Sequence, residues 1–253
     1  INLIAMTLAF VAALTYSMKG TEEKEQVYEM IGIASVEEVD TCVEDTVIID
    51  EITLPKNFDY VYERFKVFNP EIDTATVITF NEVCTHYKLD TTPSMLEWCV
   101  GQILLESGAK QYYQTGHPKE GLLVRSSVGA VGFTQIMPTT AEGYLRKYVT
   151  YEEADCMKGL GCTSFDFVND GTKKRVRVDM STEWITNKTN NIILWGYIMR
   201  HKLDRRPDIL KALVAYNAGT GGMIKFVNRG GNLYNHKYVQ GVLFKLNYAE
   251  ERI

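Results

Sequence analysis

The stretch that decides the fold is Thr91-Thr-Pro-Ser-Met-Leu-Glu-Trp-Cys-Val-Gly-Gln-Ile-Leu-Leu-Glu-Ser-Gly108. Its Thr-Thr-Pro start is typical of a helix N-terminus, where threonine caps the first turn and proline fits it. Apolar residues then form a broad face through Ser94–Glu106, which predicts a buried helix. Gly108 stands where a C-cap glycine belongs. The sequence therefore places the Glu106 carboxyl in the last turn of a buried helix.

Helical patterns surround this segment on both sides. A long loop is expected at 109–128. Residues 150–180 depart from the helical pattern, because short alternating runs flank the turn signal Asn169-Asp-Gly171, which predicts an inserted β-hairpin. The fold class is therefore predicted as α+β, mainly α, with residues 74–253 forming one helical domain. The other expected helices are Ala75–Tyr87, one opening at Pro138, Thr189–Arg200, Ile209–Ala218 and Tyr238–Tyr248.

Two N-terminal regions precede this domain. Residues 1–20 are mostly apolar, with no charge from Ile1 to Met18. They are marginal in length for a membrane span and resemble the core of a signal peptide without its basic start. We expect a hydrophobic helix that contacts a membrane or a partner, and an ordinary buried helix is the alternative. Residues 21–73 carry no recognisable chemistry and are expected to be a small accessory region.

Composition narrows the function classes. The 253 residues carry a formal net charge of −5 and contain no basic run, which argues against nucleic acid binding by bulk charge. The five cysteines form no Cys-x-x-Cys pair and the four histidines are scattered, so we expect no zinc site and no cofactor. The candidate disulfide pairs are Cys156 with Cys162 and Cys84 with Cys99. The alternative is that all cysteines are free and mostly buried.

Three short segments carry the candidate chemistry. They are Ile103–Gly108, Ser126–Pro138 and Ala212–Gly219. The glycines of the second segment would let the backbone approach a ligand closely, although a tight turn before a helix explains them equally well. The third places a tyrosine and an asparagine just before a glycine, which alone is typical of packing and capping.

Glu106 is the candidate acid. Desolvation at the end of an apolar helix disfavours the ionised carboxylate and raises its pKa. The negative end of the helix dipole acts in the same direction. A carboxylic acid that is still protonated near neutral pH can donate its proton to a glycosidic oxygen. For a lone glutamate, a surface position at a helix end is the alternative.

The three segments together resemble the catalytic domain of soluble lytic transglycosylases, which has a lysozyme-like fold and is related to goose-type lysozyme. The resemblance lies in an ordered set of motifs. These are Glu-Ser-Gly at 106–108, Gly-Ala-x-Gly-(apolar)-x-Gln-Ile-Met-Pro-x-Thr-Ala at 129–141 and Ala-Tyr-Asn-Ala-Gly at 215–219. The match covers about residues 74–250.

The resemblance implies site residues by position. Glu106 matches the catalytic acid and base, and Tyr216 matches a tyrosine beside that carboxyl. Asn191 matches a structural asparagine. The residues implied to bind or line the glycan are Ser126, Gln135, Met137 and Asn217. Lys110–Arg125 departs from the family as an apparent insertion, whose Tyr112, Tyr113 and His117 would extend the groove. No second acid precedes the last helix.

The resemblance also implies an activity on peptidoglycan glycan strands. The expected reaction cleaves the β-1,4 bond between MurNAc and GlcNAc and leaves 1,6-anhydroMurNAc, with no metal. Hydrolysis of the same bond, as by goose-type lysozyme, is the first alternative. A structural virion or envelope protein that only binds is the second. The expected location is the bacterial periplasm and cell envelope, or a phage virion, with a membrane or virion partner held through residues 1–20.

Overall fold

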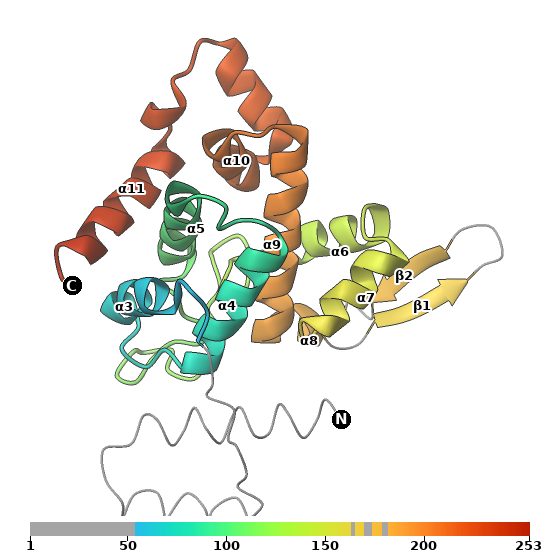
Figure 1. Ribbon diagram of the computed structural model, residues 1–253, viewed down its shortest axis with the longest axis horizontal. Helices are drawn as coiled ribbons and strands as arrows, with labels where there is room; N and C mark the ends of the chain where they lie inside the picture. The colour runs from blue at the N-terminus through green and yellow to red at the C-terminus, as the bar shows by residue number, and fades with distance from the viewer. Residues whose placement is uncertain (1–53, 163–164, 170–173, 179–181) are drawn as a thin grey trace, which may run out of the picture. The chain divides into compact units, whose positions relative to one another are not determined.

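The computed structural model describes residues 54–162, 165–169, 174–178 and 182–253. This part of the chain is mainly helical, and its strands are two short ones (Figure 1). The helices are α3 (Phe58–Phe68), α4 (Thr74–His86), α5 (Pro93–Glu106), α6 (Pro138–Lys147), α7 (Tyr151–Gly159), α8 (Thr182–Thr186), α9 (Lys188–Arg205), α10 (Ile209–Asn228), the 3₁₀ turn η1 (Leu233–Asn235) and α11 (Lys237–Glu250).

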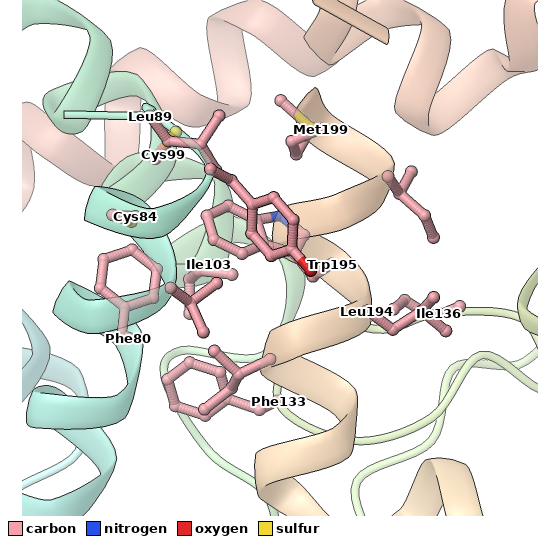
Figure 2. Close-up of a cluster of buried hydrophobic side chains, with 14 of the residues drawn as sticks. Phe80, Cys84, Leu89, Cys99, Ile103, Phe133, Ile136, Leu194, Trp195 and Met199 are labelled. Carbon is pink, nitrogen blue, oxygen red and sulfur yellow. The ribbon is translucent and has the colours of Figure 1, made fainter. Parts of the chain in front are cut away.

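The core is built around α9, whose Trp195 is fully buried. Its ring stacks on Phe80 of α4 with 5.3 Å between centroids. Phe65 of α3 meets Phe80 and Phe133 edge-on at 5.2 and 5.7 Å. Figure 2 shows Phe80, Ile103, Phe133 and Trp195 in this cluster. The loop that carries Phe133 is therefore anchored in the core by its own side chain, at the cost of burying its backbone.

Helices α5 and α11 pack closely at Gly101. A Cβ on Gly101 would lie 2.6 Å from Cγ of Leu246 and 2.8 Å from Cγ1 of Val242, both on α11. Further along, a Cβ on Gly241 of α11 would lie 3.0 Å from Leu105. The missing side chains let the two helices approach in antiparallel directions. As a result, the start of α11 lies against the end of α5.

The helical core begins earlier than predicted. The sequence placed residues 21–73 in an accessory region, but the compact unit runs from Pro55 to Ile253. Phe58, Val61 and Phe65 of α3 are buried in the same core as the later helices. The physical reason is that α3 presents one apolar face, which packs against α4, α5 and α11. The other predictions for residues 1–53 lie outside the described residues.

The region after α6 contains a helix that was not predicted from the sequence. Thr150 and Glu153 form a capping box: Glu153 N donates to Thr150 Oγ1 at 3.2 Å, and Thr150 N donates to Glu153 Oε2 at 2.6 Å. This cap starts α7. Strands β1 (Phe165–Asn169) and β2 (Lys174–Val178) then pair antiparallel. The turn that would join them lies outside the described residues, so the hairpin stays a prediction.

The helix predicted at Ile209–Ala218 continues past its expected end, with a break at Gly219. Gly219 has φ 72° and ψ 160°, a conformation that glycine adopts readily, and helical structure resumes beyond it to Asn228. The two halves of α10 are therefore separate helical segments joined at Gly219.

No disulfide joins the four cysteines of the described residues. Cys84, Cys99 and Cys162 are buried and Cys156 is exposed. Neither candidate pair is formed, which agrees with the alternative of thiols that are mostly buried. Burial raises the pKa of Cys84 and Cys99 well above the ordinary value.

The hydrophobic helix expected at residues 1–20 lies outside the described residues. Within the described part of the chain, no helix has the length and apolar character that crossing a membrane requires.

We predict that Gly101→Ala lowers the free energy of unfolding by about 1–3 kcal/mol, because its methyl group would overpack the contact between α5 and α11. Urea denaturation measures this change. Gly143→Ala is the matched control, because Gly143 lies on α6 and no atom lies within 4 Å of the place that an added methyl group would take. That substitution should stabilise the protein by about 0.5–1 kcal/mol. Equal effects at the two positions would contradict the close packing at Gly101.

Candidate active site

Glu106 is the last residue of α5. The helix ends there because Ser107 leaves helical geometry and Gly108 adopts a left-handed φ of 64°. The side chain is partly buried, and desolvation raises the pKa of the carboxyl to about 7, against the opposing effect of a hydrogen bond from Tyr238. Desolvation is the larger effect, so the carboxyl can hold its proton nearer to neutral pH than an ordinary glutamate does.

Tyr238 is the residue that contacts the carboxyl. Its hydroxyl donates to Oε1 of Glu106 from the first turn of α11. Burial and the adjacent negative charge raise the pKa of Tyr238 well above its ordinary value, so the phenol keeps its proton. This role was not predicted from the sequence. The available signal was a tyrosine that shares the buried face of the last helix with Val239 and Val242.

Tyr216, the tyrosine expected beside the carboxyl, uses its hydroxyl elsewhere. It donates to the carbonyl oxygen of Thr134 at 2.8 Å. The negative charge of Glu106 nevertheless helps burial to raise the pKa of Tyr216, which places the two side chains in the same electrostatic environment. Tyr238 therefore donates the direct hydrogen bond to the carboxyl, and Tyr216 donates its hydrogen bond to the loop.

The loop at 131–135 is held by side chains from several elements. Ser107 Oγ donates to the Phe133 carbonyl at 2.6 Å, and Gln111 Oε1 accepts from Phe133 N at 2.7 Å. Asn191 Oδ1 accepts from Thr134 N at 2.8 Å, and Asn191 Nδ2 donates to the Val131 carbonyl at 3.2 Å. These bonds satisfy backbone groups of a buried loop that has little regular pairing.

The three motifs therefore meet at one loop. Ser107 of the first motif and Tyr216 of the third each donate to a carbonyl of the second, at Phe133 and Thr134. Asn191, expected to be structural, is fully buried and holds the same loop. Since Ser107 directly follows Glu106, the contact that fixes the loop also fixes the end of the helix that carries the carboxyl.

The expected glycan-binding residues lie in and around this loop. Ser126 Oγ accepts from Ala130 N at 2.9 Å, which closes the turn before the loop. Gln135 is 8% exposed, and its side-chain Nε2 donates a hydrogen bond to the Gly132 carbonyl at 2.8 Å. This bond supports the loop. Met137 is half-buried at the start of α6, and Asn217 is exposed after Tyr216. Of these four side chains, those of Ser126 and Gln135 form hydrogen bonds to the backbone of the turn and the loop.

The apparent insertion at 110–125 is ordered by its own contacts. The ring of Tyr113 stacks on His117 with 4.3 Å between centroids, and its backbone pairs with Leu122 and Gly121. Tyr112 is 52% exposed. Whether these side chains extend a glycan groove stays a prediction.

The described residues contain no cluster of three or more His, Cys, Asp or Glu side chains that would hold a metal ion. The arrangement around Glu106 is a carboxyl with a raised pKa and one neutral phenol that donates a hydrogen bond to it. Such a group can give a proton to a substrate oxygen and take one back. Comparison of the chain with models of known protein families and with curated proteins found no match.

We predict that Tyr238→Phe raises the pKa of Glu106 further above about 7, because the hydrogen bond that stabilises the carboxylate is removed. A ¹³C NMR titration of the Glu106 carboxyl measures the pKa. Tyr216→Phe is the control, since its hydroxyl bonds to Thr134 and not to Glu106. A pKa in Tyr238→Phe that is unchanged or lower would contradict the assigned bond.

We predict that Glu106→Gln stabilises the fold in alkaline solution. The folded pKa of about 7 lies above the ordinary value of 4.5, so stability is lost as the pH rises from about 4.5 through 7. At pH 8 the buried carboxylate costs up to ~3 kcal/mol, which glutamine avoids. Thermal unfolding at pH 8 and pH 4 measures the difference between variant and wild type.

The advantage of Glu106→Gln should shrink at the lower pH. Glu97→Gln, at an exposed position on the same helix, is the control. A stability difference for Glu106→Gln that does not depend on pH would show that the carboxyl is not held in a desolvated position.

Proposed function

We propose that this chain is a peptidoglycan lytic transglycosylase with a lysozyme-like helical domain. It cleaves the β-1,4 bond between MurNAc and GlcNAc and forms 1,6-anhydroMurNAc. The observation that carries this proposal is the desolvated carboxyl of Glu106, whose pKa is raised to about 7 beside the Tyr238 hydroxyl. The convergence of the three motifs on the loop at 131–135 supports the resemblance, because their shared contacts give a physical reason for their joint presence.

A single carboxyl favours a route without a protein nucleophile. Retaining glycosidases place their two carboxyl groups about 5–5.5 Å apart. A second carboxylate that close would raise the pKa of Glu106 by repulsion. Among the described residues, burial raises the pKa of Glu106 and the Tyr238 hydrogen bond opposes it, with no contribution from another carboxyl. The reaction therefore depends on Glu106 and on groups of the sugar itself.

The reaction proceeds in two proton transfers. Protonated Glu106 donates to the glycosidic oxygen as the bond to C1 of MurNAc breaks, and GlcNAc leaves with a free 4-hydroxyl. The N-acetyl group of MurNAc stabilises the developing positive charge at C1. The Glu106 carboxylate then removes the proton of the MurNAc 6-hydroxyl, whose oxygen bonds to C1. The carboxyl is regenerated and no water is consumed.

The surrounding residues have separate roles in this scheme. Tyr238 positions the carboxyl and stabilises its ionised form between the two transfers, because it donates to the oxygen that carries the charge. Tyr216, through Thr134, holds the loop beside the site. Ser126, Met137 and Asn217 are proposed to contact the glycan, and the outward side of Gln135 is proposed to line the groove.

The setting of this activity follows from the same proposal. The substrate partner is the glycan strand of peptidoglycan, in the bacterial periplasm and cell envelope for wall remodelling or at the wall during phage entry. Residues 1–20 are proposed to hold a membrane or virion partner. Fractionation into membranes and tail or capsid particles distinguishes the two settings by where the protein is found.

Digestion of purified sacculi tests the activity. We expect muropeptides that end in anhydroMurNAc, which are lighter by one water than products with a reducing end. Glu106→Gln should lower the rate by about 10²–10⁴-fold, the usual contribution of a general acid and base. Glu97→Gln should digest at the wild-type rate. Mass spectrometry of the released muropeptides measures both.

Two outcomes would replace the proposal. Reducing-end products from the wild type, abolished by Glu106→Gln, would identify a hydrolase of the goose-lysozyme kind. Retention on sacculi without any released product would identify a binding protein. Wild-type turnover in Glu106→Gln would remove Glu106 from the mechanism altogether.

A further inference from the structure

Residues of α6, α9 and α10 line a pocket that does not include Glu106. Two tyrosines, Tyr144 of α6 and Tyr148 at its C-terminal end, form one wall. The other wall is cationic and comes from the end of α9 and the start of α10. Its charged members are Lys202, Arg205, Arg206 and Lys211, with His201 beside them. None of the residues that line this pocket bonds to Glu106.

The charge of the pocket is one-sided. Four permanently or largely cationic side chains line it, and no described carboxyl does, although the whole chain has a net charge of −5. Three described acids act on its residues: Asp208 pairs with Lys211, and the charges of Asp204 and Glu153 act on His201. Asp208 pairs with Lys211 at 3.6 Å and also caps α10, and Asp204 pairs with Arg200. Such a concentration of like charge on one wall is unfavourable unless an anion neutralises it.

Lys202 shows the effect of this imbalance. Burial lowers the pKa of its ammonium group to about 8, and repulsion from Arg205 and Arg206 acts in the same direction. Its Nζ donates one hydrogen bond, to the Ala215 carbonyl at 3.0 Å. An ammonium group has three N–H donors, and this bond uses one of them.

Two of the cations contact the tyrosine wall. The guanidinium of Arg205 lies over the Tyr148 ring at 5.3 Å, and Lys202 lies 5.7 Å from the centre of the Tyr144 ring. Both are cation–π contacts with a ring face. A guanidinium in such a contact can still form two parallel hydrogen bonds to an oxyanion through its edge.

We propose that this pocket is a binding site for an oxyanion, the phosphate or carboxylate group of a small molecule. Lys202 and Arg206 bind the charged oxygens, and Arg205 closes the site from the Tyr148 side. The tyrosine wall packs against the uncharged part of the ligand. The inference rests on the pocket and its charges alone and does not depend on the activity proposed for Glu106.

Calorimetric titration of the full chain with inorganic phosphate tests the proposal, with citrate as the carboxylate arm and chloride holding the ionic strength constant. We expect saturable binding by the wild type. Arg206→Gln should weaken it by roughly tenfold to a hundredfold, the loss expected for a charge-assisted hydrogen bond. Arg229→Gln is the control, because Arg229 is an exposed arginine that lies outside the pocket. It should bind like the wild type.

The probe that the wild type binds with the higher affinity identifies the ligand group: phosphate for inorganic phosphate, carboxylate for citrate. Lys202→Met, which keeps the aliphatic stem, should also lose binding; if it does not fold, Arg206→Gln carries the test. Absence of saturation with both probes would overturn the proposal. Equal affinity in Arg206→Gln, Arg229→Gln and the wild type would overturn it as well, because the anion would then bind elsewhere.

Discussion

The structure depends on how the buried backbone at 131–135 obtains its hydrogen bonds. Phe133 draws this loop into the core, where its amides and carbonyls are out of reach of bulk water. Ser107, Asn191 and Tyr216 supply partners from the end of α5, from α9 and from α10. Leaving such groups unpaired costs about 1–3 kcal/mol each. The loop therefore ties three helices together, and the carboxyl of the proposed active site stands one residue from one of these ties.

The fold buries the Glu106 side chain, which disfavours its ionised form. Its helix ends against α11, and the close approach at Gly101 and Gly241 brings Tyr238 to the carboxyl. Burial raises the pKa of Glu106 and the phenol lowers it, so the balance near 7 comes from two opposed effects rather than from one. This balance suits a group that must both give and take a proton.

Local signals in the sequence were sufficient for α5 and for the position of Glu106. The capping threonine and the apolar face lie within the helix or next to it, and α5 begins one residue from its predicted start. Tyr238 was missed because its partner is 132 residues away in the chain and the register of α5 against α11 is a tertiary property. Helix α7 was missed because it is only 9 residues long and its main signal is its cap.

The buried thiols of Cys84 and Cys99 have a consequence for how the molecule can be studied. They lie on neighbouring core helices, α4 and α5, and burial keeps them as unreactive thiols. A reagent that modifies thiolates can reach them only when these helices separate. The rate at which the native protein is alkylated at these two positions therefore reports how often the core opens. The protein's own cysteines serve as the probes.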